Sequence, residues 1–306
     1  MSDSNSLINI GELSKPATVL IEKISDAIGG LFKPWQMRRV AQAEAETEKI
    51  SALSRIEVSE LEQRSLHRLL TEEAMKQANM ESITRKALPG LQDDARPNEV
   101  EDDWLTNFFE KCRLISDHDM QKLWARVLSG EANKPGTFSK RTVDFIGTLD
   151  KSDATLFTNL CSYIWTLPYG CTHTPLIYDV DDAIYKRNGI YFSSLKHLDS
   201  IGLITFDSIA GYTWRNLPEK CVLYYHTHVI LLSFKKPNDN KLKIGHTLLT
   251  KTGQELAPIA ADEPIPEFLD YVIARWSKEG HIASSPWPRV VLSQTAPPPT
   301  PSPPPG

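Results

Sequence analysis

Side chains of the kinds that bind metals gather in the C-terminal half of the chain: Cys171, His173, Cys221, His226 and His228. Cys-x-His and His-x-His spacing places two side chains on one face of a β-strand, because side chains alternate along a strand. Structural zinc sites instead show close Cys pairs or His pairs three to five residues apart, and the sequence contains neither. We therefore interpret these residues as ordinary strand residues and expect no metal and no cofactor.

The sequence contains no motif typical of nucleophilic catalysis or of nucleotide binding. There is no Gly-x-Ser-x-Gly elbow and no glycine-rich phosphate loop. Ser116, His118 and Asp119 contain the residue types of a catalytic triad, but they are adjacent in the chain. A cap residue followed three positions later by an acid is typical of the start of a helix. We expect a protein without enzymatic activity or a small-molecule substrate.

Lys140 and Arg141 are the first candidates for an interaction site. They follow Ser139, a predicted helix cap, so two cations occupy a first turn where the helix dipole disfavours them. Ion pairs with Glu131 or Asp144 would compensate for this. The alternative is a bound anion or a nucleic-acid phosphate.

A second candidate is the helix predicted at residues 192–200, which carries Lys196 and His197 on its outward side. Such side chains contact phosphates or base edges in DNA-binding proteins. The chain has 34 Lys and Arg against 39 Asp and Glu, a net charge of -5. This balance argues against a uniformly basic nucleic-acid-binding surface and leaves room for a local basic patch.

The N-terminal half is predicted to be helical. Residues 1–34 contain a short apolar helix, residues 35–87 form a long charged helix, and residues 88–103 form an acidic linker with two prolines, where we place a boundary. Residues 104–167 form a helical domain. Its central helix begins at Ser116, buries Trp124 and stops at Gly130, and Ser152 caps a later helix.

Residues 168–283 are predicted to form an α+β module. A helix near 193–201 precedes a strand at 202–206 that pairs with residues 209–214. A long strand run follows at 222–234, then a strand at 242–247, a helix from residue 250 and one more helix within 264–279. This order resembles a winged helix. The predicted fold class is mainly α with a winged-helix-like C-terminal module, followed by a proline-rich tail at 284–306.

The N-terminus is polar, no apolar run approaches the length of a membrane span, and the four cysteines are scattered. We expect a cytoplasmic protein with reduced thiols. The apolar helix within residues 1–34 has three interpretations: packing on the body of the protein, an oligomer contact, or a membrane-surface contact aided by Trp35, Arg38 and Arg39. For an exposed apolar face we expect a protein partner rather than lipid.

One stretch resembles a known family. Leu-Ile-Ser-Asp-His-Asp-Met-Gln-Lys-Leu-Trp-Ala-Arg-Val-Leu-Ser-Gly-Glu at 114–131, the Pro-Gly-Thr-Phe-Ser-Lys-Arg-Thr that follows at 135–142, and Ile-Gly-Gly-Leu-Phe-Lys-Pro-Trp-Gln at 28–36 are similar to a bacterial family known as domain of unknown function 2806. The resemblance extends to about residue 260. It implies an association with mobile elements and defence loci, and it supplies no catalytic residues. Within the motif, packing alone does not require the polar residues Gln121, Glu131, Lys140 and Arg141. Gln121 and Glu131 therefore join Lys140 and Arg141 as candidate interaction residues.

The residues predict a non-enzymatic interaction or sensor protein, and the resemblance implies that it is bacterial, with a role in anti-phage defence or abortive infection. The predicted partner is another protein or a second copy of the chain. Two alternatives stay open. The first is a DNA-binding winged-helix regulator, and the second is a peripheral membrane effector that acts through the N-terminal helix.

Overall fold

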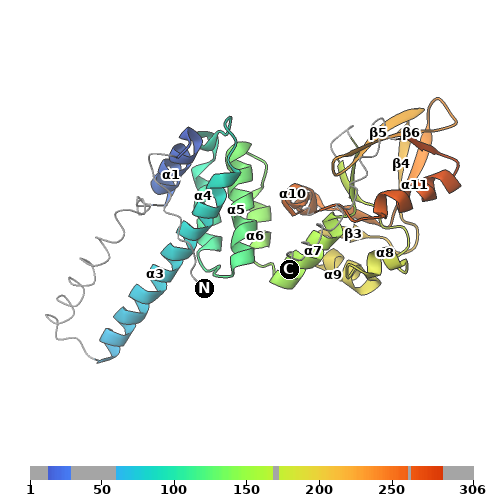
Figure 1. The fold of residues 1–306 in the computed structure, drawn as a ribbon. Coiled ribbons are helices and arrows are strands. Elements are labelled where there is room, and N and C mark those ends of the chain that lie inside the picture. Colours follow the sequence, from blue (N-terminus) through green and yellow to red (C-terminus); the bar gives the residue numbers. More distant parts are fainter. Residues whose placement is uncertain (1–12, 29–59, 168–171, 261–262, 285–306) are drawn as a thin grey trace, which may run out of the picture.

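The computed structural model describes residues 13–28, 60–167, 172–260 and 263–284. These residues form a helical body followed by a C-terminal module of helices and antiparallel strands (Figure 1). The expectations for residues 29–59, including the first part of the long charged helix, and for the proline-rich tail lie outside the described residues. Within the described part, no helix is both long and apolar enough to cross a bilayer.

The N-terminal apolar helix packs on the body of the protein. This helix, α1 (Lys15–Ala27), begins after the cap residue Ser14. Its residues Leu20 and Ile24 are completely buried against α4 (Asp102–Cys112) and the 3₁₀ turn η4 (Pro97–Glu99). Lys23 adds an ion pair to Asp102 at 2.5 Å. The apolar face of α1 is therefore covered by the chain itself.

Within the predicted long charged helix, the structure describes α3 (Glu60–Ala87). The buried residues of α3 all lie from Glu81 onward, where it packs on α5 (His118–Asn133). Residues 88–103, expected as an acidic linker, contain the 3₁₀ turns η3 (Leu88–Gly90) and η4. Leu88 and Val100 are buried there, and the Arg96 N–H donates to the Ala132 carbonyl at 2.8 Å. This connection is packed on the helical body, so α3 and α5 share one core.

The predicted helical block is present as α4, α5, α6 (Lys140–Ile146) and α7 (Lys151–Cys161). Its boundaries differ from the predictions at three points. The cap of α5 is Asp117, whose carboxylate accepts two backbone N–H groups, and α7 begins after Asp150 rather than Ser152. Gly130 does not stop α5. It lies inside the helix, where a Cβ would approach Phe138 Cε2 to 2.8 Å, so close packing on Phe138 accounts for the glycine.

The C-terminal module begins within the predicted helical domain, with a strand. Its elements are β1 (Ile164–Leu167), β2 (Thr172–Pro175), α8 (Ala183–Lys186), α9 (Phe192–Ser200), β3 (Ile204–Phe206), β4 (Tyr212–Leu217), β5 (Lys220–Tyr225), β6 (His228–Ser233), β7 (Asn240–Gly245), β8 (Thr247–Leu249), α10 (Lys251–Ala260), α11 (Phe268–Lys278) and β9 (Ile282–Ser284). They form a five-stranded sheet ordered β2-β1-β5-β6-β9 and two strand pairs, β3–β8 and β4–β7.

The strand pairing corrects two predictions. β3 pairs with β8, not with residues 209–214, and β4 pairs with β7. The predicted long run at 222–234 is divided into β5 and β6 by a turn at His226, where φ is 49°. Between the two strand pairs, the Phe234 N–H donates to the Glu219 carbonyl at 2.8 Å, and the Glu219 N–H donates to the Pro237 carbonyl at 2.9 Å. Residues 212–245 therefore form one long bent hairpin, inserted between β3 and β8.

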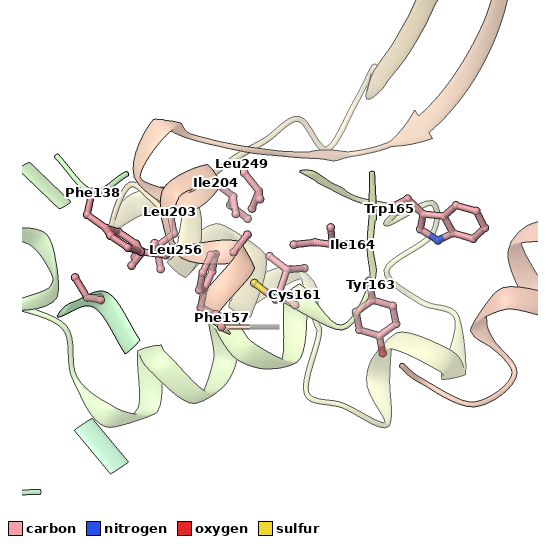
Figure 2. Close-up of a cluster of buried hydrophobic side chains, with 14 of the residues drawn as sticks. Phe138, Phe157, Cys161, Tyr163, Ile164, Trp165, Leu203, Ile204, Leu249 and Leu256 are labelled. Carbon is pink, nitrogen blue, oxygen red and sulfur yellow. The ribbon is translucent and has the colours of Figure 1, made fainter. Parts of the chain in front are cut away.

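The helical body and the C-terminal module share a continuous core. Figure 2 shows Phe157 and Cys161 of α7 close to Leu203, Leu249 and Leu256. α10 supplies this junction because it contacts α5, α6 and α7 as well as β2 and β8. The helical N-terminal part and the antiparallel sheets agree with the predicted fold class.

Candidate anion-binding surface

Two of the predicted interaction residues are buried structural links. Gln121, 5% exposed, joins α5 to α3: its Oε1 accepts from Ser82 Oγ at 2.9 Å and Lys86 Nζ at 2.6 Å. Glu131, 3% exposed, accepts the backbone N–H groups of Gly136 at 2.6 Å and Phe138 at 2.8 Å. Burial raises the pKa of Glu131 despite these bonds. Neither side chain presents a free polar group to a partner.

The cations at the start of α6 are compensated by a remote carboxylate. Lys140 pairs with Asp103 at 3.5 Å, not with Glu131 or Asp144, and Arg141 is exposed without an ion pair among the described residues. Glu255 of α10 accepts from Ser139 N–H at 2.8 Å and from Thr142 Oγ1 at 2.6 Å. This places a negative charge at the N-terminus of α6, where the helix dipole favours one. The structure therefore gives no need for a phosphate at this position.

The predicted DNA-contacting side chains of α9 also have partners within the chain. Lys196 lies 3.1 Å from Asp199 of the same helix, and its ammonium is 5.8 Å from the centre of the Phe206 ring. His197 Nε2 lies 2.7 Å from Asp153 Oδ1 of α7. These partners neutralise the outward face of α9, so the helix contributes little positive charge to a ligand.

The residues considered as metal ligands are not brought together. No group of three His, Cys, Asp or Glu side chains suited to a metal occurs among the described residues, and Cys171 lies outside them. Cys221 is buried, which raises the pKa of its thiol. His173 faces Thr166 Oγ1 at 3.1 Å, and burial lowers the pKa of its imidazole. His173, Cys221 and His228 lie in strands β2, β5 and β6, whereas His226 occupies the turn between β5 and β6.

Unpaired positive charge is concentrated in the long hairpin. Residues 207–246 contain six Lys and Arg against three Asp and Glu, although the whole chain carries a net charge of -5. Most Lys and Arg side chains elsewhere in the described chain form ion pairs, whereas none of these six forms an ion pair with a described carboxylate. They are Arg215, Lys220, Lys235, Lys236, Lys241 and Lys243.

Three of these cations are on one face of the β4–β7 pair, which we call the ribbon. Trp214 pairs with Leu242, and Leu217 pairs with Asn240. Two residues of β4, Arg215 and Asn216, therefore lie opposite the single residue Lys241 of β7, which makes a β-bulge. Lys243 follows on the same face, about 7 Å further along the strand. All three cations are exposed. Because like charges placed opposite each other destabilise a strand pair, this arrangement favours a bound anion.

A cleft of about 300 Å³ adjoins the ribbon, between the β6–β7 loop and the turn that joins α11 to β9. Lys235, Lys236 and Lys241 line it, together with His281 and Glu279. Glu279 lies 3.9 Å from Arg275 Nε and 3.9 Å from His281 Nε2. Since Lys241 belongs both to the ribbon and to the cleft, the two form one positively charged surface.

The sequence analysis missed this surface, although part of its signal is visible in the printed sequence. Lys241 and Lys243 alternate with Leu242 and Ile244, which is the pattern of a half-buried strand with one basic face. The distant Arg215 joins that face only through the pairing of β4 with β7.

A family model described as a protein of unknown function, DUF2806, matches residues 63–273. The match covers more than half of the chain and runs from α3 to α11, so it includes the ribbon. The chain therefore belongs to this family, as the resemblance of its sequence motif implied. Neither the curated proteins nor the solved structures contain a match.

Proposed function

We propose that this DUF2806 protein is a non-enzymatic nucleic-acid-binding protein, in which the ribbon holds the phosphate backbone. The observation that carries the proposal is the cluster formed by Arg215, Lys241 and Lys243. These side chains are exposed, share one face and have no ion pair within the described chain. Backbone phosphates are the natural partners of such a cluster, because neutralising them releases condensed counterions.

The arrangement of α9, β3 and β8 supports a winged-helix-like reading of the module. The helix precedes β3, and β3 pairs with β8 across the long hairpin. That hairpin occupies the place of a wing. A two-stranded ribbon is one of the shapes that the major groove of DNA admits. Because the cations of α9 are paired, we assign the contact to the ribbon and expect binding that depends weakly on base sequence.

The other predicted roles relate to this proposal in different ways. Binding of nucleic acid is one form of the predicted interaction or sensor function, and the anti-phage role implied by the family stays a prediction. The membrane alternative rested on an exposed apolar face of α1. Leu20 and Ile24 of that helix are buried in the protein, so this face offers no support for a membrane effector.

The test compares two charge-matched variants of the full chain. The first is Arg215→Gln/Lys241→Gln/Lys243→Gln, and the control is Lys134→Gln/Lys140→Gln/Arg141→Gln on the helical body. All six positions are exposed. Anisotropy of a labelled DNA duplex measures affinity over a series of salt concentrations. If the ribbon cations contact three phosphates, the ribbon variant should lower the slope of log affinity against log salt by about 2.7.

The control variant should leave the slope close to that of the wild-type protein. The same titrations with single-stranded DNA and RNA identify the preferred polyanion. A wild-type protein that binds none of the three at low salt would refute the proposal. A loss of slope in the control variant, with none in the ribbon variant, would refute the ribbon contact and place it at the cluster that includes Lys140 and Arg141, the residues that the sequence alone suggested.

A further inference from the structure

We propose that the cleft beside the ribbon binds the terminal phosphate of a nucleic-acid strand. This inference rests on the proposed function. The ribbon contacts the internal phosphodiesters of the strand, and the cleft binds the phosphomonoester at its end.

The charge inside the cleft favours a dianion. Lys235, Lys236 and Lys241 line it and have no ion pair among the described residues. Of the two carboxylates that line the cleft, Glu279 is positioned between Arg275 and His281. Asp239 is the other, so three lysines line the cleft together with one carboxylate that has no described ion pair.

The backbone keeps the cleft open for Lys235. Gly280 has a φ of +84°, and a Cβ at this position would lie 3.3 Å from Lys235 Nζ. His281 is held beside it by an edge-to-face contact with Phe234, with ring centres 4.8 Å apart. The space of about 300 Å³ is at the lower end of ligand pockets, which suits one nucleotide unit rather than a larger molecule.

The chemistry of the end group distinguishes it from the rest of the strand. A phosphomonoester carries a charge of about -1.5 to -2 at neutral pH and three acceptor oxygens, whereas each internal phosphodiester carries a single charge. Lysine ammonium groups act as compact point charges with three donors each. A strand that follows the ribbon would pass Lys241, which lines both surfaces, and present its end to Lys235 and Lys236.

The experiment uses short DNA strands of one sequence that end in a 5′-phosphate, a 3′-phosphate or hydroxyl groups only. The wild-type protein should bind one of the phosphorylated strands about tenfold more tightly than the hydroxyl strand, as expected for charge-assisted hydrogen bonds. Lys235→Gln/Lys236→Gln should abolish this preference and retain binding of the hydroxyl strand. Arg215→Gln/Lys243→Gln, the matched control, should weaken all three strands and keep the ratio.

A second variant tests the sign of the charge effect. Asp239 has a φ of 56°, a conformation that asparagine also tolerates, so Asp239→Asn removes the carboxylate with little strain. It should increase the preference for the phosphorylated strand.

Equal affinity of the wild-type protein for phosphorylated and hydroxyl strands would overturn the inference and leave the proposed function intact. A preference that survives in Lys235→Gln/Lys236→Gln would overturn it as well. Failure of every strand to bind would instead refute the proposed function itself, and end recognition with it.

Discussion

Two buried tryptophans of the helical body differ in one hydrogen bond. Trp104, 4% exposed, donates its Nε1–H to the Phe138 carbonyl at 2.7 Å. Trp124, 0% exposed, packs edge-to-face on Phe108 at 5.1 Å, and no acceptor among the described residues bonds to its Nε1. Replacing each tryptophan by phenylalanine removes the N–H and part of the ring. The two substitutions should therefore have different costs.

The hydrogen bond sets the size of the difference. Trp104→Phe leaves the buried Phe138 carbonyl without its donor, which costs about 1–3 kcal/mol, in addition to the loss of apolar contact. Trp124→Phe loses similar contact but also removes an unpaired buried N–H, so we expect it to cost less by about the same 1–3 kcal/mol. Trp124→Ala removes the whole ring and should lower the free energy of unfolding by roughly 3–5 kcal/mol.

Urea unfolding followed by far-ultraviolet circular dichroism measures these three values against the wild-type protein. From the least to the most destabilising, the expected order of the variants is Trp124→Phe, Trp104→Phe and Trp124→Ala. Equal costs for the two phenylalanine variants would show that the Trp124 N–H has a partner, such as a buried water. An unchanged transition in Trp124→Ala would refute the burial of this face of α5.

Two further predictions concern the turn after α5. Gly130→Ala should destabilise the protein, although alanine favours a helix by about 1 kcal/mol, because its Cβ would lie 2.8 Å from Phe138 Cε2; a higher melting temperature than wild type would contradict this. Burial raises the pKa of Glu131 in the folded state. Protonated Glu131 therefore adds to the free energy of unfolding at pH values below its ordinary pKa of about 4.3. This contribution is lost as the pH rises through the raised pKa of the folded state. The stability advantage of the wild-type protein over Glu131→Gln should therefore shrink with rising pH across that window, and a constant difference in urea unfolding would contradict the raised pKa.

The sequence alone determined the local elements and the family. The spacing of apolar residues predicted the helices of residues 104–161 and the burial of Trp124, because helical periodicity is local to a few turns. It also predicted the order of α9 and β3 and the helix that follows β8. The motif at 114–142 predicted the family that the comparison confirmed.

The tertiary structure decided which of these elements meet. Alternation along a strand shows which side is buried but does not identify the neighbouring strand, so the pairing of β3 with β8 was predicted wrongly. Lys140 and His197 were candidates because their partners could not be identified from spacing, whereas Asp199, the partner of Lys196, lies one helical turn away in the same helix. Asp103 and Asp153 lie far from Lys140 and His197 in sequence. The ribbon shows the same limit: Arg215 and Lys241 are 26 positions apart, and only the fold places them opposite each other on one exposed face.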